Sequence, residues 1–360
     1  MTRPVRACID LSALQHNLSL ARQAAPDSRV MAVIKANAYG HGAVPVARAL
    51  KQADAFAVAS IDEALLLREA GVQRPLLLLQ GVFSADELEA AANYDLQVAV
   101  HVPEQIDWLE QSRISTPLHV WLQVDTGMHR LGVPADYAAT ALDRLEKLVE
   151  RRGGSIRLMS HLACADIPDN PTNNAQLAVF QALPERGLER SLANSAALLS
   201  RPDMCFDWVR PGIMLYGASP FDVDVAQPVK LQAAMNFESQ LIAVHPRKQG
   251  ESIGYGQTWK CPVDMPVGVV AAGYGDGYPR QAPAGMPVLV NGKIVPLVGR
   301  VSMDTLYVDL RNQPEAVAGD SVQLWGSCLP VEAVAARAGT ISYELFCGVS
   351  PRVPREYVNG

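Results

Sequence analysis

Residues 32–42 read AVIKANAYGHG, so an apolar run carries Lys35 directly into a turn of small residues and glycines. Such a run is typical of a buried strand. A lysine at the dry end of a strand is easily desolvated, which disfavours its ammonium form, lowers its pKa and leaves an amine able to attack a carbonyl. Tyr39 is expected near the same opening, where its hydroxyl can hydrogen-bond an anion. Taken alone, the stretch fits an ordinary surface lysine better, and the rest of the chain decides against that interpretation.

Around this stretch the chain alternates short apolar strands with helical segments, from residue 29 to residue 209. Eight strands are expected, over residues 30–34, 55–59, 76–79, 96–100, 118–124, 156–159, 189–193 and 206–209. Continuous apolar strands that alternate with helices favour parallel pairing with both faces buried. The economical arrangement is a (β/α)8 barrel of the TIM type. A doubly wound open sheet is the alternative, because periodicity does not show closure.

After Gly217 the helical periodicity fades, and short strands lie between Gly and Pro turns. Strands are expected over residues 237–244, 267–272, 287–290, 294–297, 305–310 and 321–325, with a late helix near 331–338. Asn291-Gly292 between two apolar runs predicts a hairpin. We therefore expect an α/β barrel domain over residues 10–225 and a mostly antiparallel β domain over residues 226–360, which residues 1–9 join as an N-terminal strand.

The composition of the chain narrows its class. Of 360 residues, 49% are hydrophobic and 19% charged, which is typical of a soluble globular protein. The net charge of −6 comes without a basic patch, so neither nucleic acid nor a membrane surface is an expected partner. Six scattered cysteines without metal-ligand spacing predict incidental thiols in a reducing compartment and no metal site. With no signal-peptide pattern and no bilayer-length apolar run, the expected location is cytoplasmic.

Polar residues gather where the expected barrel strands end, which is the active face of such barrels. These residues, in chain order, are Lys35 and Tyr39, then Asp125, His129 and Arg130, then His161, Asn194, Ser195 and Arg210. Each has an ordinary structural interpretation by itself, as a core histidine, a helix cap or an ion-pair partner. Their shared position at the strand ends makes them a candidate site.

The segment after the eighth strand adds a candidate phosphate site. It reads RPGIMLYG over residues 210–217, which predicts a helix start with exposed backbone N–H groups at Gly212 and Ile213. Such N–H groups bind phosphate, and barrels often place a phosphate site after strands seven and eight, here with Ser195. A lysine opposite a phosphate-binding corner fits pyridoxal 5′-phosphate.

At these residues the sequence resembles the alanine racemases, and the likeness runs over nearly the whole chain. The segments that carry it, in the family's order, are residues 33–42, 125–132, 194–199, 210–217, 254–258, 273–278 and 299–305. The resemblance implies a pyridoxal-phosphate barrel, a β-rich C-terminal domain and a head-to-tail homodimer with shared active sites.

The resemblance also implies a role for each matching residue. Lys35 matches the lysine that forms an aldimine with the cofactor and serves as one acid/base, and Tyr255 matches the opposing acid/base, which comes from the partner subunit. The residues that match phosphate ligands are Tyr39, Ser195, Gly212, Ile213 and Tyr343. Arg210 matches the residue on the pyridine nitrogen, supported by His161. The substrate-carboxylate site is matched by Arg130 and by the Met303-Asp304 pair.

The implied reaction is interconversion of L- and D-alanine through a Cα carbanion, with one base on each face of Cα. The sequence departs from many family members at Gln123, a position often held by a carbamylated lysine. Alternatives within this fold are a broader amino-acid racemase, a decarboxylase and a non-enzymatic pyridoxal-phosphate carrier. A biosynthetic role, supplying D-alanine for peptidoglycan, and a catabolic role would use the same site.

Overall fold

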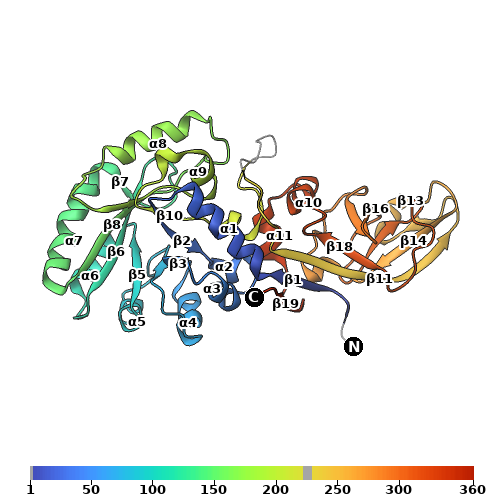
Figure 1. Ribbon diagram of the computed structural model, residues 1–360, viewed down its shortest axis with the longest axis horizontal. Helices are drawn as coiled ribbons and strands as arrows, with labels where there is room; N and C mark the ends of the chain where they lie inside the picture. Colours follow the sequence, from blue (N-terminus) through green and yellow to red (C-terminus); the bar gives the residue numbers. More distant parts are fainter. Residues whose placement is uncertain (1–2, 222–228) are drawn as a thin grey trace.

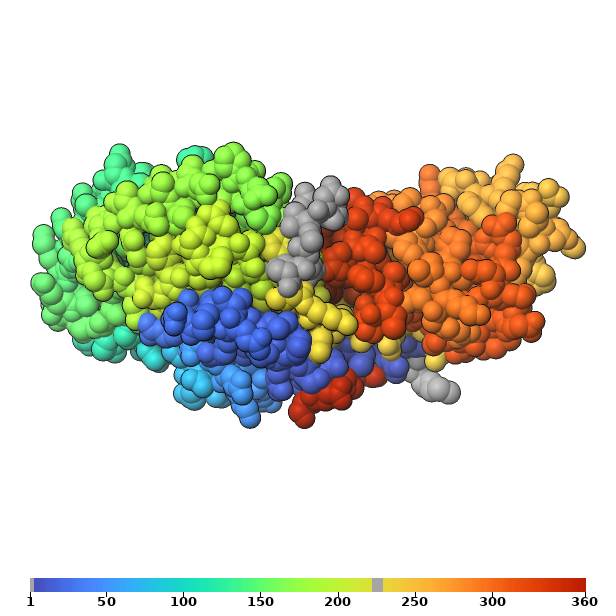
Figure 2. Space-filling model, turned by 45° about the horizontal axis from the view of Figure 1, so that its top comes forward, coloured from blue at the N-terminus to red at the C-terminus, as the bar shows by residue number. Residues whose placement is uncertain are grey.

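The computed structural model describes residues 3–221 and 229–360 and shows an elongated chain with two β-rich halves (Figure 1). The first half is a barrel of strands surrounded by helices, and the second is a β domain that carries two helices beside the barrel. The expected boundary between residues 225 and 226 lies outside the described residues, so it stays a prediction. In Figure 2 the two halves meet near the middle of the molecule, where the N-terminal part of the chain (blue) lies beside its C-terminal end (dark red).

The barrel is closed. Its eight strands, in order around the ring, are β2 (Arg29–Val33), β3 (Ala55–Val58), β4 (Leu76–Leu78), β5 (Leu96–Val100), β6 (Leu118–Asp125), β8 (Gly154–Met159), β9 (Glu189–Ser191) and β10 (Trp208–Val209). All neighbours pair in parallel, and β10 pairs with β2 to complete the ring. The prediction of a TIM-type barrel is confirmed, and the open-sheet alternative is wrong. β7 (Val133–Pro134) adds a short parallel pairing beside β6.

Helices connect and cover the barrel strands. They are α1 (Leu11–Ala24), α2 (Lys35–Tyr39), α3 (Ala43–Ala49), α4 (Ile61–Glu69), α5 (Glu87–Asn93), α6 (Pro103–Gln111), α7 (Ala138–Arg152), α8 (Pro171–Gln181) and α9 (Ser195–Ser200). In α7 the buried residues recur at helical spacing, as Ala138, Ala141, Leu142, Leu145 and Leu148, so one stripe packs on the barrel.

The C-terminal domain is an antiparallel barrel joined to both chain ends. Its strands are β11 (Met235–Arg247), β14 (Met265–Val270), β15 (Pro287–Val290), β16 (Lys293–Val298), β17 (Leu306–Asp309) and β18 (Ser321–Trp325). The ring closes because β11 pairs with both β14 and β18. Beside it, β1 (Arg6–Asp10) pairs with β11 and with β19 (Arg355–Val358). The predicted hairpin is present between β15 and β16, where Asn291 and Gly292 both have positive φ.

Two helices of the C-terminal half, α10 (Val331–Ala338) and α11 (Ser342–Gly348), lie next to the barrel (Figure 1). The first has the bounds that the sequence predicts. The second contacts α2, so this half contributes to the surroundings of Lys35. All six cysteines are free thiols. No helix in residues 3–221 and 229–360 combines the length and apolar character needed to traverse a lipid bilayer.

Candidate active site

Lys35 begins a left-handed turn made of ordinary L-residues. After β2 the next four residues, Ala36 to Tyr39, all have φ between 50° and 53°. Left-handed helical backbone costs an L-residue about 1–2 kcal/mol because Cβ crowds the following carbonyl. The turn is closed by Gly40, where an added Cβ would lie 2.2 Å from the Phe346 carbonyl oxygen. A strained segment of this kind persists only where its surroundings hold it, which is common at functional sites.

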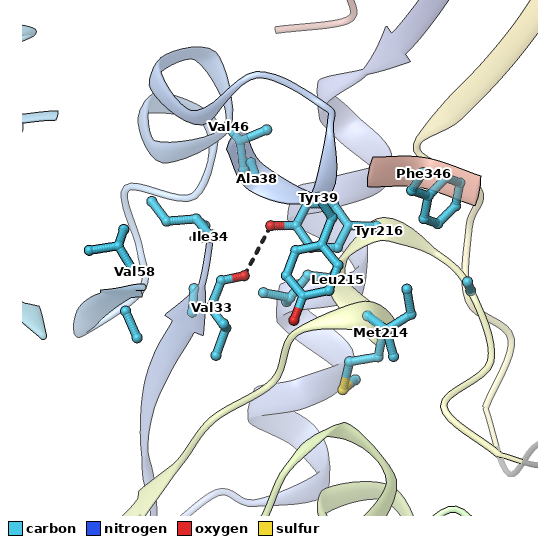
Figure 3. Close-up of a cluster of buried hydrophobic side chains, with 14 of the residues drawn as sticks. Val33, Ile34, Ala38, Tyr39, Val46, Val58, Met214, Leu215, Tyr216 and Phe346 are labelled. Atoms are coloured by element: carbon cyan, nitrogen blue, oxygen red, sulfur yellow. Dashed lines mark hydrogen bonds between the residues drawn. The ribbon is translucent and has the colours of Figure 1, made fainter. Parts of the chain in front are cut away.

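Three aromatic rings contact one another beside this turn. Tyr39 stacks on Tyr216 with ring centroids 4.7 Å apart, and the His41 ring is tilted against Tyr216 at 4.6 Å. The Tyr216 hydroxyl donates to the Val33 carbonyl at 3.0 Å (Figure 3). The His41 ring nitrogen Nδ1 lies 2.9 Å from the Tyr39 carbonyl oxygen. Strand β2 and the tyrosine that follows it are therefore fixed to one buried aromatic stack.

Most of the predicted site residues line one cavity of about 610 Å³ at the carboxyl end of the barrel. Those brought together are Lys35, Tyr39, Gln123, Arg130, His161, Asn194, Ser195, Arg210, Gly212, Ile213 and Tyr343. They come from five barrel strand ends and from α11. Of the other strand-end candidates, Asp125 and His129 form the turn after β6, where the Asp125 carboxylate accepts from three backbone N–H groups and from the His129 ring.

At the predicted phosphate site, the backbone at Gly212 lies close to the hydroxyl groups of Ser195 and Tyr39. The N–H of Gly212 donates to the Ser195 hydroxyl at 2.8 Å, so this amide is not free as the sequence suggested. The helix after it, η3 (Ile213–Tyr216), is a single 3₁₀ turn. A Cβ on Gly212 would stand 2.6 Å from the Tyr39 hydroxyl, so only glycine lets the backbone approach that oxygen. Hydroxyl and amide groups thus converge on one spot.

Arg210 is a buried cation with few partners. Its side chain donates to the Ser191 hydroxyl and to the Ser160 carbonyl oxygen. Burial lowers its pKa to about 10, so it remains charged at neutral pH. His161 lies nearby, and its pKa is lowered to about 3 by burial first and then by Arg210. The imidazole is therefore neutral and contributes no second charge.

The environment of Lys35 favours a neutral amine. Burial is the main cause that lowers its pKa, and the charge of Arg130 adds to it. Cys347, from α11, faces the same amine. A lysine with a lowered pKa in a cavity is suited to act as a nucleophile or a base.

Gln123 lies in the cavity wall, where its side-chain amide donates to the Leu131 carbonyl oxygen at 3.0 Å. This bond holds the residue next to Arg130. A neutral amide thus hydrogen-bonds the turn that carries the arginine.

The remaining predicted residues do not line this cavity. Tyr255 lies in η4 (Tyr255–Gln257), between β12 (Ser252–Ile253) and β13 (Trp259–Lys260), and is 71% exposed. Met303 is 52% exposed, and neither it nor Asp304 lines the barrel cavity. In Figure 1, β13 lies at the end of the C-terminal domain that is remote from the barrel. Within one chain these residues face solvent.

The Met303-Asp304 segment is held by a charge cluster around Asp276, whose side chain is fully buried. Arg3 reaches both Asp276 oxygens at 2.7 and 2.9 Å, and Arg352 reaches one at 2.8 Å. Arg352 also donates to the Met303 carbonyl oxygen and lies 2.9 Å from the Asp304 carboxylate. The exposed segment is therefore tied to both ends of the chain.

Asp276→Asn is expected to lower the free energy of unfolding by about 2–3 kcal/mol, because it removes the charge that two arginines share. Urea denaturation measures this change. The matched control is Asp264→Asn, which breaks an ion pair with Lys248 whose side chains are 60% and 77% exposed. There we expect a change within about 0.5 kcal/mol. Equal effects of the two variants would contradict the structural role of the Asp276 cluster.

Two histidines with lowered pKa values, the buried His41 and the cavity-lining His161, predict a pH dependence of stability. The folded-state pKa is about 4 for His41 and about 3 for His161, both lowered mainly by burial. Between these values and the unfolded pKa near 6.5, the unfolded chain binds more protons, so acid favours unfolding. Each histidine is expected to cost about 2 kcal/mol of stability at pH 5. Urea titrations of the parent and of His41→Gln at pH 7.5 and pH 5 test this, since the variant should lose about 2 kcal/mol less; equal losses would contradict the prediction.

Some cavity residues were missed from the sequence. Gln80 follows β4, so the strand-end rule that selected the other residues applies to it as well. Cys347 reaches the cavity from α11, and nothing in the local sequence signals that contact. Among the described residues, no group of three or more His, Cys, Asp or Glu side chains lies together in a way that could hold a metal ion.

Comparisons with known proteins cover both halves of the chain. A family model described as "Alanine racemase, N-terminal domain" matches residues 9–220, and one described as "Alanine racemase, C-terminal domain" matches residues 234–357. An alanine racemase of Nitrosococcus oceani is 53% identical over 350 residues, covering 97% of this chain and 98% of the relative. One of Thioalkalivibrio sulfidiphilus is 54% identical over 364 residues, covering 99% and 100%. The crystal structure of the biosynthetic alanine racemase from Pseudomonas aeruginosa superposes with a TM-score of 0.93 at 45% identity, covering 99% of this chain and 100% of that one.

Proposed function

The chain belongs to the alanine racemase family, so its reaction is the interconversion of L- and D-alanine, and we propose that it uses pyridoxal 5′-phosphate in a site shared by two subunits. The observation that carries the proposal is that the expected catalytic residues lie on two different domains of the chain. The barrel cavity holds a lysine and a set of anion-binding groups, whereas the expected second base, Tyr255, is exposed on the other domain. Because family models match both domains, the alternative of a non-enzymatic carrier built from the barrel alone is excluded.

The cavity fits a phosphorylated aromatic aldehyde. Hydroxyls of Tyr39 and Ser195 converge with the backbone at Gly212, which suits a phosphate group. Burial raises the pKa of Tyr39 above its usual range, and burial raises that of Tyr343 to about 12, so both hydroxyls are neutral donors. Lys35 opens into the same cavity with a lowered pKa, ready to bond the aldehyde. The cofactor, when bound, supplies an electron-withdrawing system that acidifies the Cα–H bond.

Lys35 and Tyr255 of the partner subunit are the proposed pair of acid/base groups. Racemisation needs a proton taken from one face of Cα and another delivered to the opposite face. Lys35 acts from the barrel side, where burial lowers its pKa and so makes the amine more available to take a proton. Tyr255 of the partner subunit acts from the opposite face of Cα. Arg130 is the proposed partner of the substrate carboxylate.

Exposure of the C-terminal segments supports a homodimer with shared sites. The side chains of Tyr255 and Met303 are 71% and 52% exposed on one chain. Arg352 of the Asp276 cluster holds the Met303 backbone through its carbonyl oxygen. A head-to-tail arrangement would bring Tyr255 and Met303 to the barrel cavity of the second subunit. If the two subunits are related by a two-fold axis, each barrel faces the C-terminal domain of the other subunit, so both sites form together.

Arg210 is the proposed partner of the pyridine nitrogen. Arginine only donates hydrogen bonds, so Arg210 would leave a pyridine nitrogen beside it unprotonated. The bound ring would then withdraw less charge from Cα, which would favour return of the proton to Cα. His161, whose imidazole is neutral, lines the same pocket.

The test of this function is Cα–H exchange. Purified protein loaded with pyridoxal phosphate is incubated in D₂O with L-alanine or D-alanine, and deuterium at Cα is followed by NMR. Exchange with both enantiomers and formation of the opposite one are expected. Exchange with neither would contradict the proposal. Release of ethylamine and carbon dioxide would indicate the decarboxylase alternative.

A further inference from the structure

One carboxylate holds the turn that carries Lys35. Glu63 lies on α4, and one of its oxygens accepts from the Ala36 N–H at 2.6 Å. Its other oxygen accepts from the Ala59 N–H at 2.8 Å. Ala36 comes directly after Lys35, and Ala59 comes directly after β3, the neighbouring strand of β2. The carboxylate therefore bridges the ends of two adjacent strands.

The position of Glu63 in its helix explains how it reaches both. Ser60 is the residue before α4, and it makes no side-chain capping bond. Glu63 is the third helical residue, from which a capping box would reach back to the Ser60 N–H. Here the side chain instead reaches one residue further, to Ala59. Because one carboxylate oxygen reaches Ala59, the other oxygen can accept from the N–H of Ala36, the first residue of the strained turn.

Other bonds to this turn hold its far end. Arg355 donates to the Gly40 carbonyl, and the Ala43 N–H donates to the Asn37 side chain. Among the described residues, Glu63 is the only one whose charged side chain hydrogen-bonds Ala36, the residue after Lys35. Its loss would free the turn exactly where the lysine departs from the strand.

Glu63 also supplies negative charge to a cationic site. The groups that face Lys35 are Arg130 from the turn after β6, Cys347 from α11 and Glu63 from α4. Arg210 and His161 line the same cavity, the first charged and the second neutral. The only carboxylate among them opposes the effect of Arg130 on the lysine amine.

We propose that Glu63 is a positioning residue for the racemisation, holding the left-handed turn after Lys35 and balancing the positive charge around its amine. This inference rests on the proposed function of Lys35. It separates two contributions, the pair of hydrogen bonds and the charge, which different substitutions remove.

Three variants of the full-length, cofactor-loaded protein test it. Glu63→Gln removes the charge and keeps an acceptor, whereas Glu63→Asp keeps the charge on a side chain too short to span both N–H groups. Asp62→Asn removes a charge from the exposed neighbouring residue of the same helical turn and is the matched control. Circular dichroism and thermal midpoints establish that each variant is folded.

The first readout is the dissociation constant of pyridoxal phosphate, from absorbance titration. We expect it to rise about tenfold in both Glu63 variants, since each loses a hydrogen bond that a backbone N–H donates to the charged carboxylate, and to stay unchanged in Asp62→Asn. The second readout is the pH profile of kcat in the direction in which Lys35 removes the proton, because the lysine amine is free of the cofactor only in the substrate complex. The acid limb is expected to move about half a unit to lower pH in Glu63→Gln, because the amine loses a favourable charge, and to stay in place in Glu63→Asp.

Mapping of the borohydride-fixed cofactor by peptide mass spectrometry separates the two claims. Attachment to a residue other than Lys35 overturns the proposed function and this inference with it. Attachment to Lys35, with Glu63→Gln indistinguishable from Asp62→Asn in affinity and pH profile, overturns the role of Glu63 and leaves the proposed function standing.

Discussion

Replacing Lys35 with alanine is expected to lower the racemisation rate by about 10³-fold or more, because in the proposed mechanism this residue supplies both the cofactor linkage and one of two acid/base groups. The loss should appear in both reaction directions. Each direction needs the lysine, once to take a proton and once to return it. Polarimetry or circular dichroism of alanine measures the rate, and borohydride reduction should no longer fix the cofactor to the chain.

Two further variants isolate the cause of that loss. Lys35→Arg keeps a cation at the same place, but a guanidinium does not release its proton at neutral pH, so we expect it to be as inactive as Lys35→Ala. Lys51→Ala, at an exposed lysine in the same domain, should retain the parent rate. Substantial activity in Lys35→Arg would contradict the role of Lys35 as a base.

Arg210→Glu is expected to change the course of the reaction as well as its rate. A carboxylate at this position would hold the pyridine nitrogen protonated and draw negative charge away from Cα. Racemisation should then fall about 100-fold or more, while the share of turnovers that end in pyruvate rises severalfold. Pyruvate is measured with lactate dehydrogenase during turnover of L-alanine, relative to the alanine racemised.

The control for this variant is Arg210→Lys, which keeps the positive charge and should not increase pyruvate formation. Because Arg210 is only 5% exposed, the thermal midpoint of each variant is compared with that of the parent before rates are interpreted. No rise of the pyruvate share in folded Arg210→Glu would contradict the proposed role of the arginine.

The barrel was predictable because its signals are local. Each strand is a short apolar run between helical segments, and all eight expected runs overlap the observed strands. Closure followed only from the structure, since the pairing of β10 with β2 joins Trp208 to Arg29, which are distant in sequence. The hairpin at Asn291-Gly292 was predictable for the same reason, because its turn needs positive φ at both residues and the Asn-Gly pair signals this locally.

The site was predictable in part. The strand-end rule brings Lys35, His161, Ser195 and Arg210 to one cavity, because parallel strands end on the same face. The left-handed backbone from Ala36 to Tyr39 had no such signal, since three of these four residues are alanine or tyrosine, which rarely adopt it. Contacts that depend on tertiary packing, such as Cys347 in the cavity wall and the amide of Gly212 on Ser195, also required the structure.

The central claim is that one active site takes Lys35 from one subunit and Tyr255 from the other. Mixing inactive Lys35→Ala with inactive Tyr255→Ala, under conditions that exchange subunits, should restore about a quarter of the parent activity, because half of the dimers then carry one intact site of two. Mixing Lys35→Ala with Arg210→Glu is the control and should restore nothing, since both residues belong to the same barrel. Recovery of activity in the first mixture alone is the predicted result. A first mixture as inactive as its components, with exchange demonstrated, would contradict a shared site.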